Sequence, residues 1–165
     1  MSRIGELFTR KRAEKKPVLI GYITAGDPSP ERMPSLIAAL ERGGVDLIEL
    51  GVPFSDPVAD GPVIMKASER ALAAGMTLAK VLDLARAVRL QSELPLLLFS
   101  YLNPVMRYGF SKLAADAKAA GADGCLLTDL SVEEADEFVA PLREAGLDTV
   151  FLAAPTSPPE RLRRV

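Results

Sequence analysis

DLIELGVPFSDPVADGP, residues 46–62, begins as a short apolar run and then becomes a loop rich in proline, glycine and aspartate. An apolar run of this length bounded by turn residues is typical of a buried strand. Glu49 lies inside the run. Because an ionised carboxylate is costly in a protein core unless it is paired or protonated, Glu49 either performs chemistry or lies at a strand end facing water. The stretch alone leaves both interpretations open.

Strand-like segments recur on both sides of this stretch and alternate with helical patterns. We expect strands at 18–24, 45–51, 95–101, 123–128 and 149–154. We expect helices at 2–15, 30–43, 63–74, 78–90, 111–120 and 132–146, the last opened by a capping box at 131–134, and another helix starting at 158 or 159. This alternation is that of repeated βαβ units and predicts an α/β fold with a parallel sheet.

Two architectures fit this pattern, a doubly wound open sheet and a (β/α)8 TIM barrel. The first strand-to-helix turn, 24–28, lacks the glycine spacing of a dinucleotide site or a P-loop. Polar and acidic residues instead follow the ends of several strands: Asp27, Glu49 with Asp56 and Asp60, Asn103, and Asp129. Barrel enzymes keep their active sites at that end of the sheet, so we expect a TIM barrel.

The chain has 165 residues and five such units, whereas a barrel of this kind has eight units in roughly 250 residues. We therefore expect residues 1–165 to form an incomplete single barrel domain with an N-terminal helix at 2–15. The rest of the barrel is expected in the natural protein.

Composition narrows the classes of partner and of chemistry. A net charge of -2 disfavours nucleic acid as a partner, and no run approaches the roughly 18 apolar residues of a membrane-spanning helix, so we expect a cytoplasmic protein. The chain has no histidine, so proton transfer near neutral pH falls to a tuned carboxylate, lysine, tyrosine or cysteine. The single Cys125 lies in an apolar run and is interpreted as a small buried residue without a catalytic role.

Successive side chains of a strand point to opposite faces, so the neighbours of Glu49 decide which way Glu49 points. If Ile48 and Leu50 face the helices, Glu49 points to the barrel axis, where burial raises its pKa toward neutrality. The proline-rich loop can bring Asp60 back over the barrel mouth, so that two carboxylates flank one small molecule. The alternative for Asp60 is a helix N-cap, and for Asp56 an Asx turn before proline.

The stretch LIELGVPFSDPVADGP at 47–62 resembles the signature of the tryptophan synthase alpha chain family. Agreeing segments are GYITAGDP at 21–28, YLNPV at 101–105 with Tyr108-Gly109, and Asp129-Leu130 with Glu133-Glu134. The resemblance covers essentially the whole chain. It implies a (β/α)8 barrel that cleaves indole-3-glycerol phosphate to indole and glyceraldehyde 3-phosphate by a retro-aldol reaction, without a metal or cofactor in this chain.

The resemblance also implies roles for individual residues. Glu49 matches the general acid/base, and Asp60 matches the aspartate that holds the indole N–H. Positions matching the indole pocket are Tyr22, Ser100 and Tyr101, and positions matching the beta-chain interface are Pro53, Asp56, Asn103, Pro104 and Asp129. The implied partner is a beta chain that carries pyridoxal phosphate in an alpha2beta2 heterotetramer. The family's phosphate grip follows strands six to eight, outside these residues.

Two further functions remain open at this point. The chain could act mainly as a non-catalytic partner that activates a beta chain, or as a stand-alone lyase that releases free indole. Either function would use the same carboxylates and the same loop, so both hypotheses are kept.

Overall fold

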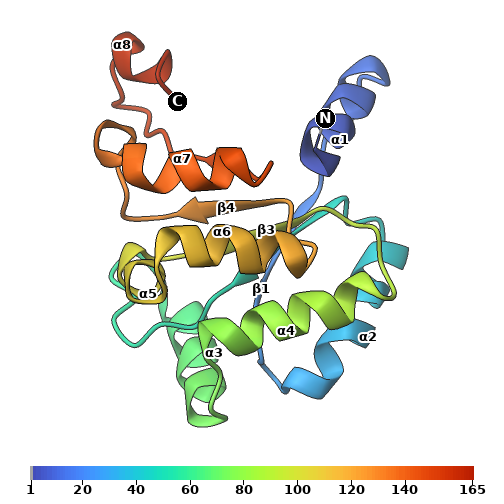
Figure 1. Ribbon diagram of the computed structural model, residues 1–165. Coiled ribbons are helices and arrows are strands. Elements are labelled where there is room, and N and C mark those ends of the chain that lie inside the picture. The colour runs from blue at the N-terminus through green and yellow to red at the C-terminus, as the bar shows by residue number, and fades with distance from the viewer. Residues whose placement is uncertain (1) are drawn as a thin grey trace.

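The computed structural model describes residues 2–165, which are built on a five-stranded parallel sheet (Figure 1). Its strands are β1 (Ile20–Thr24), β2 (Leu47–Gly51), β3 (Leu96–Ser100), β4 (Gly124–Leu127) and β5 (Asp148–Val150), and they pair in that order. Each strand therefore lies beside the next one along the chain. A doubly wound sheet reverses its strand order at a switch point, so the structure excludes that alternative and confirms the α/β class as part of a (β/α)8 barrel.

Helices lie on both sides of the sheet: those that follow the strands cover one face, and the N-terminal helix packs on the other. They are α1 (Arg3–Ala13), η1 (Pro30–Arg32), α2 (Met33–Arg42), α3 (Pro62–Ala73), α4 (Leu78–Arg89), α5 (Leu102–Tyr108), α6 (Phe110–Ala119), η2 (Val132–Glu134), α7 (Asp136–Glu144) and α8 (Pro159–Leu162). Figure 1 shows α2, α4, α6 and α7 in a row along the sheet, with α1 standing apart from them. Among residues 2–165, no helix has both the length and the apolar character needed to cross a membrane.

The two faces of the sheet pack against different elements. Ile48 and Leu50 of β2 belong to the large core cluster that the helices complete. Leu47, on the opposite face, belongs to a smaller cluster that Ile4 and Leu7 of α1 close. We call these the outer face and the inner face. The alternation predicted for β2 is confirmed, and it assigns Glu49 to the inner face.

Four local predictions were wrong. No helix was predicted directly after β3, but this segment forms α5, whose first turn contains Pro104 and whose end is marked by Gly109 at φ +92°. The capping box at 131–134 does not form, because Ser131 bonds the Glu134 side chain at 3.1 Å and caps no backbone N–H. Helix α7 consequently begins at Asp136.

The other two differences lie at the ends of the chain. Strand β5 ends at Val150 and not at 154, and within residues 2–165 its one paired strand is β4. Helical spacing predicts that Ile4, Leu7 and Phe8 share one buried face of α1, but only Ile4 and Leu7 are buried, and Phe8 is 42% exposed. Ser2 does cap this helix, accepting the N–H of Gly5 at 3.1 Å.

A charged network ties the amino-terminal end of the sheet together. Asp123, only 6% exposed, accepts hydrogen bonds from Arg89 at 3.0 Å and from the Leu96 N–H at 2.9 Å, and pairs with Arg3 of α1 at 3.1 Å. Arg89 also donates to backbone carbonyls, including that of Gly121 at 2.7 Å. One carboxylate thus joins α1, α4, β3 and β4.

Replacing Asp123 should be strongly destabilising. Asp123→Ala leaves the Arg89 guanidinium buried without its carboxylate, which typically costs about 3–5 kcal/mol. Asp83→Ala, which removes an exposed ion pair with Arg86, is the matched control and should cost less than about 1 kcal/mol. Urea unfolding of the complete gene product measures both variants, and equal losses would contradict this account of the network.

Candidate active site

Glu49 occupies the middle of β2, between Tyr22 of β1 and Leu97 of β3 in register. The interpretation of Glu49 as a strand-end residue is therefore wrong. Its side chain is half-buried, and within residues 2–165 the structure shows no hydrogen bond or ion pair to it. Burial raises the pKa of this carboxyl above its ordinary value. An unpartnered, partly desolvated carboxyl is able to give and take a proton.

The loop at 52–61 leaves β2 and carries the second carboxylate, Asp60. Helix α3 begins after this loop with Gly61 as its N-cap and without a side-chain cap, so the N-cap interpretation of Asp60 is wrong. Burial raises the pKa of Asp60, and a hydrogen bond from the Tyr101 hydroxyl opposes that rise. Burial thus favours the neutral form of the Asp60 carboxyl, and the Tyr101 hydroxyl favours its charged form.

Aromatic rings line the inner face beside Glu49. The rings of Tyr22 and Phe99 meet edge to face with centroids 5.3 Å apart. The Tyr22 hydroxyl lies 3.5 Å from the Thr24 hydroxyl oxygen, and its ring passes over Gly51. Burial raises the pKa of Tyr22, and the nearby carboxylates add to this effect. The phenol therefore stays protonated at neutral pH.

Ser100 does not join this group, so its assignment to the indole pocket needs correction. Glycine 51 is in register with Phe99, and side chains alternate along β3, so Phe99 faces inward while Ser100 faces the helices. Ser100 is buried there and donates to the Tyr101 carbonyl at 3.1 Å. Phe99, and not Ser100, lies on the inner face beside Tyr22.

Tyr101 directly follows β3 and lies under the loop at 52–61. Its side chain is 3% exposed, and its hydroxyl accepts the Ala59 N–H at 3.0 Å. Its ring packs on Phe54 with centroids 5.4 Å apart. The structure thus places Tyr101 beside Asp60, and it does so through contacts of Tyr101 with the loop at 52–61.

The residues expected at a partner interface fall into two groups. Asp56 and Asn103 are exposed at the same end of the sheet as Asp60. Pro53 is buried within the chain, where it lines a groove of about 410 Å³ together with Pro104. Asp129 is exposed but already has a partner, since it accepts the Leu102 N–H at 2.7 Å and so holds the start of α5.

The turn around Asp56 departs from the simple Asx interpretation. The Asp56 carboxylate accepts a hydrogen bond from the Ser55 hydroxyl at 2.6 Å, and the turn itself is closed by the Val58 N–H on the Asp56 carbonyl at 2.9 Å. Val58 at the tip is 87% exposed. The loop therefore presents a carboxylate and an apolar side chain to the surroundings.

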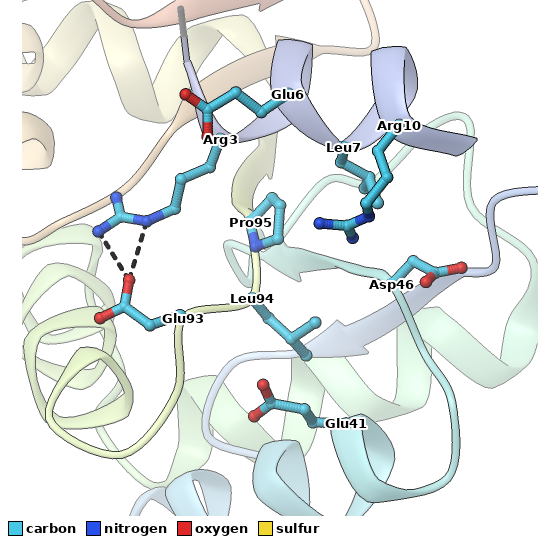
Figure 2. Close-up of a pocket in the computed structure, with 9 residues that line it drawn as sticks. All are labelled: Arg3, Glu6, Leu7, Arg10, Glu41, Asp46, Glu93, Leu94 and Pro95. Atoms are coloured by element: carbon cyan, nitrogen blue, oxygen red, sulfur yellow. Dashed lines mark hydrogen bonds and ion pairs between the residues drawn. The ribbon is translucent and has the colours of Figure 1, made fainter. Parts of the chain in front are cut away.

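A second cavity lies at the opposite end of the sheet and contains none of these residues. Figure 2 shows its charged lining, with Arg3 bonded to Glu93. The cavity of about 370 Å³ is lined by Arg3, Glu6, Leu7, Arg10, Glu41, Asp46, Glu93, Leu94 and Pro95. Lys11 and the Leu19 N–H both bond Asp46 on its edge. In a barrel this end contributes stability, and the chemistry takes place at the carboxyl ends of the strands.

Fold and site together define a class of protein. Sequential parallel strands with outer helices form part of a (β/α)8 barrel, and it carries two carboxyls with raised pKa values, Glu49 on the inner face of β2 and Asp60 in the loop that follows β2. This is the arrangement of a barrel enzyme that uses carboxylates for proton transfer.

Comparison with known proteins gives the family. The family profile described as tryptophan synthase alpha chain matches residues 8–165, and the chain belongs to this family. The tryptophan synthase alpha chain of Solibacter usitatus (strain Ellin6076) is 64% identical over 165 residues, which are 100% of this chain and 62% of that relative. The chain therefore spans less than two thirds of the length of this relative.

Solved structures agree with this assignment. Tryptophan synthase subunit alpha from Legionella pneumophila str. Paris is 44% identical and superposes with a TM-score of 0.96, covering 99% of this chain and 63% of that one. A structure of the tryptophan synthase alpha2beta2 complex from Pyrococcus furiosus matches at 44% identity with a TM-score of 0.84, covering 89% of this chain and 62% of that one.

The close packing of Tyr22 on Gly51 can be tested by a double-mutant cycle. A Cβ at residue 51 would lie 2.6 Å from Cζ of Tyr22 and nearer still to its hydroxyl oxygen. Gly51→Ala should therefore cost about 1–3 kcal/mol of unfolding free energy through overpacking. In a Tyr22→Ala background the same substitution should cost much less, because the ring is gone. Additive losses in the cycle would show that the two residues do not press on each other.

Proposed function

We propose that residues 1–165 form part of a single barrel domain that cleaves indole-3-glycerol phosphate to indole and glyceraldehyde 3-phosphate. This is the retro-aldol reaction of the tryptophan synthase alpha subunit in tryptophan biosynthesis. The observation that carries the proposal is the partly buried Glu49, which has no hydrogen bond or ion pair within residues 2–165 and lies on the inner face beside Tyr22 and Phe99. Family membership and the position of Asp60 support it.

Glu49 is proposed as the group that moves the proton. The reaction breaks the bond between indole C3 and the glycerol side chain. A protonated carboxyl gives its proton to C3, and the resulting carboxylate takes the proton of the glycerol hydroxyl whose carbon becomes the aldehyde. The carboxyl ends as it began, so no external acid or base is consumed. A raised pKa keeps both protonation states accessible near neutral pH.

Asp60 is proposed to act in its charged form. Protonation at C3 places positive charge on the indole ring, and a carboxylate at the ring N–H stabilises that charge. The Tyr101 hydroxyl favours the ionised form of Asp60 and offsets the effect of burial. The two carboxyls thus differ in the way the mechanism needs, because Asp60 has a donor and Glu49 has none.

The proposal extends to residues that this chain lacks and to a partner. The substrate phosphate is proposed to bind in later βα units, since residues 1–165 match 62% of the length of the Solibacter usitatus relative. The partner is proposed to be a beta chain carrying pyridoxal phosphate, in an alpha2beta2 assembly located in the cytoplasm. Exposed Asp56 and Asn103, with Val58 at the loop tip, support a contact surface beside the site.

A second candidate function is activation of that partner without catalysis. The feature that favours it is the same exposed loop end, which does not depend on the state of Glu49. The two functions are separable, because lysis needs the carboxyl of Glu49 whereas stimulation of a partner needs the surface around Asp56.

Glu49→Gln in the complete gene product tests the lyase. The amide cannot exchange protons, so release of indole should fall by roughly 10²–10⁴-fold. The fold should survive. The pKa of Glu49 is higher in the folded protein than in the unfolded chain. Ionisation of Glu49 therefore lowers the free energy of unfolding as the pH rises through the folded-state pKa. At a pH below the unfolded-state pKa, Glu49 is protonated in both states and has no such effect. The variant should thus match the wild-type Tm at low pH and equal or exceed it at pH 8. Wild-type rates in the variant would contradict the assigned role.

Asp56→Ala tests the partner surface. The substitution removes an exposed carboxylate that bonds only the neighbouring Ser55 hydroxyl in the described chain. We expect basal indole release to change less than twofold while the stimulation by a beta chain falls at least fivefold. Gel filtration and a coupled assay measure binding and stimulation separately, with Asp83→Ala as the exposed-carboxylate control. Stimulation that stays at the wild-type level would place the interface elsewhere.

A further inference from the structure

The loop at 52–61 connects β2 to α3, and both of its ends are fixed by hydrogen bonds or ion pairs. Asp60 lies within the loop, away from the backbone hydrogen bonds of the sheet. At its start the Val52 N–H donates to the Phe99 carbonyl at 2.8 Å. Beyond its end, α3 is fixed by Arg70, which forms a two-pronged ion pair with Asp27 at 2.7 and 2.8 Å. Between these anchors lie residues 54–60, most of them exposed. The placement of Asp60 therefore needs an additional contact in the middle of the loop.

Tyr101 supplies that contact from the end of β3. Its ring packs on Phe54, near the start of the loop, with centroids 5.4 Å apart. Its hydroxyl accepts the Ala59 N–H at 3.0 Å, near the end of the loop. Asp60 is the residue that follows Ala59, and the Tyr101 hydroxyl lowers the pKa of its carboxyl. One side chain, 3% exposed, thus touches the loop at both sides of its exposed tip.

The Tyr101 hydroxyl can both accept and donate a hydrogen bond, and its neighbours decide which it does. A phenol has one proton to donate and lone pairs to accept with. Since the Ala59 N–H is a donor, the oxygen accepts there, and the proton of the phenol remains free to be donated to a neighbouring side chain, Asp60 or Thr128. Burial raises the pKa of Tyr101, and the charge of Asp60 adds to this, so the phenol remains a donor at neutral pH.

We propose that Tyr101 is a positioning residue whose hydroxyl, by accepting the Ala59 N–H next to Asp60, fixes the position of the Asp60 carboxylate beside the inner face. This inference rests on the function proposed above and adds a role beyond lining the pocket. Tyr101 acts through Asp60 and does not exchange protons with the substrate. Removing the hydroxyl therefore changes the charge state and orientation of Asp60 while the ring contact with Phe54 remains.

The groups around Asp60 set the expected pH dependence. Tyr22 of β1 and Tyr101 after β3 both interact electrostatically with Asp60, and Glu49 of β2 acts on the same Tyr22 hydroxyl. The Tyr101 hydrogen bond lowers the pKa of Asp60, against the rise due to burial. Loss of this bond raises the pKa of Asp60. Because Asp60 works as the anion, the acid limb of the rate profile then moves to higher pH.

The test compares Tyr101→Phe with Tyr108→Phe in the complete gene product. Tyr108 is a matched control, because its hydroxyl also donates to a carboxylate, Asp116 at 2.6 Å, but on the helix layer between α5 and α6. For Tyr101→Phe we expect kcat for indole release to fall roughly tenfold with a smaller change in KM, and the acid limb of kcat/KM to move upward by at least half a pH unit. For Tyr108→Phe we expect both to stay at the wild-type values.

Amide exchange supplies a readout that does not depend on activity. In Tyr101→Phe the Ala59 N–H loses its acceptor and should exchange roughly tenfold faster, whereas the Val52 N–H keeps its bond to Phe99 and should not change. A wild-type exchange rate at Ala59 or an unmoved acid limb would overturn the inference. If the wild-type product released no indole, the proposed function would fail, and the exchange at Ala59 would still decide whether Tyr101 holds the loop.

Phe54→Leu separates the ring contact from the hydroxyl. It removes the aromatic neighbour of Tyr101 and keeps the hydroxyl with its hydrogen bond from the Ala59 N–H. We expect its acid limb to coincide with that of the wild type. A shift as large as that of Tyr101→Phe would show that loop packing, and not the hydroxyl, sets the state of Asp60.

Discussion

The direction of Glu49 in β2 is the constraint on which the site depends. Its neighbours Ile48 and Leu50 are fully buried against the helices, so they cannot turn inward without exposing the largest core cluster. A slip of one residue would reverse every side chain of the strand. Helix packing on one face of β2 thus places the Glu49 side chain on the other face. Burial raises the pKa of Glu49 there, and within residues 2–165 no hydrogen bond or ion pair lowers it. The chemistry proposed for Glu49 is a consequence of how the outer face packs.

The rest of the molecule divides between the two ends of the strands. At the amino-terminal end, Asp123 and Asp46 are bonded to arginine, lysine and backbone N–H groups and join α1 to the sheet. Toward the carboxyl end, within residues 2–165, Glu49 has no hydrogen bond or ion pair, and the Tyr101 hydroxyl lowers the pKa of Asp60. Carboxylates of one chemical type therefore stabilise the sheet at one end and remain reactive at the other. The difference lies in how many donors surround each of them.

Sequence reasoning predicted the parts of the fold that carry a strong local signal. Alternating strands and helices gave the α/β class, and the polar residues after the strands indicated the end where the site lies. The orientation of Glu49 followed from its apolar neighbours. The continuous run Leu96–Phe99 carries no alternation, because a strand covered on both faces is apolar at every position. Register with Gly51 was needed to see that Phe99 faces inward and Ser100 outward.

Other features depend on contacts between distant segments and leave little trace in the sequence. Helix α5 begins where Asp129, from the end of the next strand, accepts the Leu102 N–H. Asp60 resembles a helix cap in sequence, and only the structure shows Gly61 in that position and the Tyr101 hydroxyl beside the carboxyl. Pro104 and Gly109 were the available signals for α5, as a first-turn proline and a terminating glycine.

The pKa of the Glu49 carboxyl tests the central claim most directly. In the complete gene product with ¹³C-labelled glutamate carboxyls, its titration is assigned by the resonance that disappears in Glu49→Gln. We predict a midpoint above the ordinary value for glutamate in water, because Glu49 is partly desolvated and lacks a stabilising donor. A midpoint at or below that ordinary value would show that the carboxyl is paired or well hydrated, and would contradict its assignment as the group that transfers the proton.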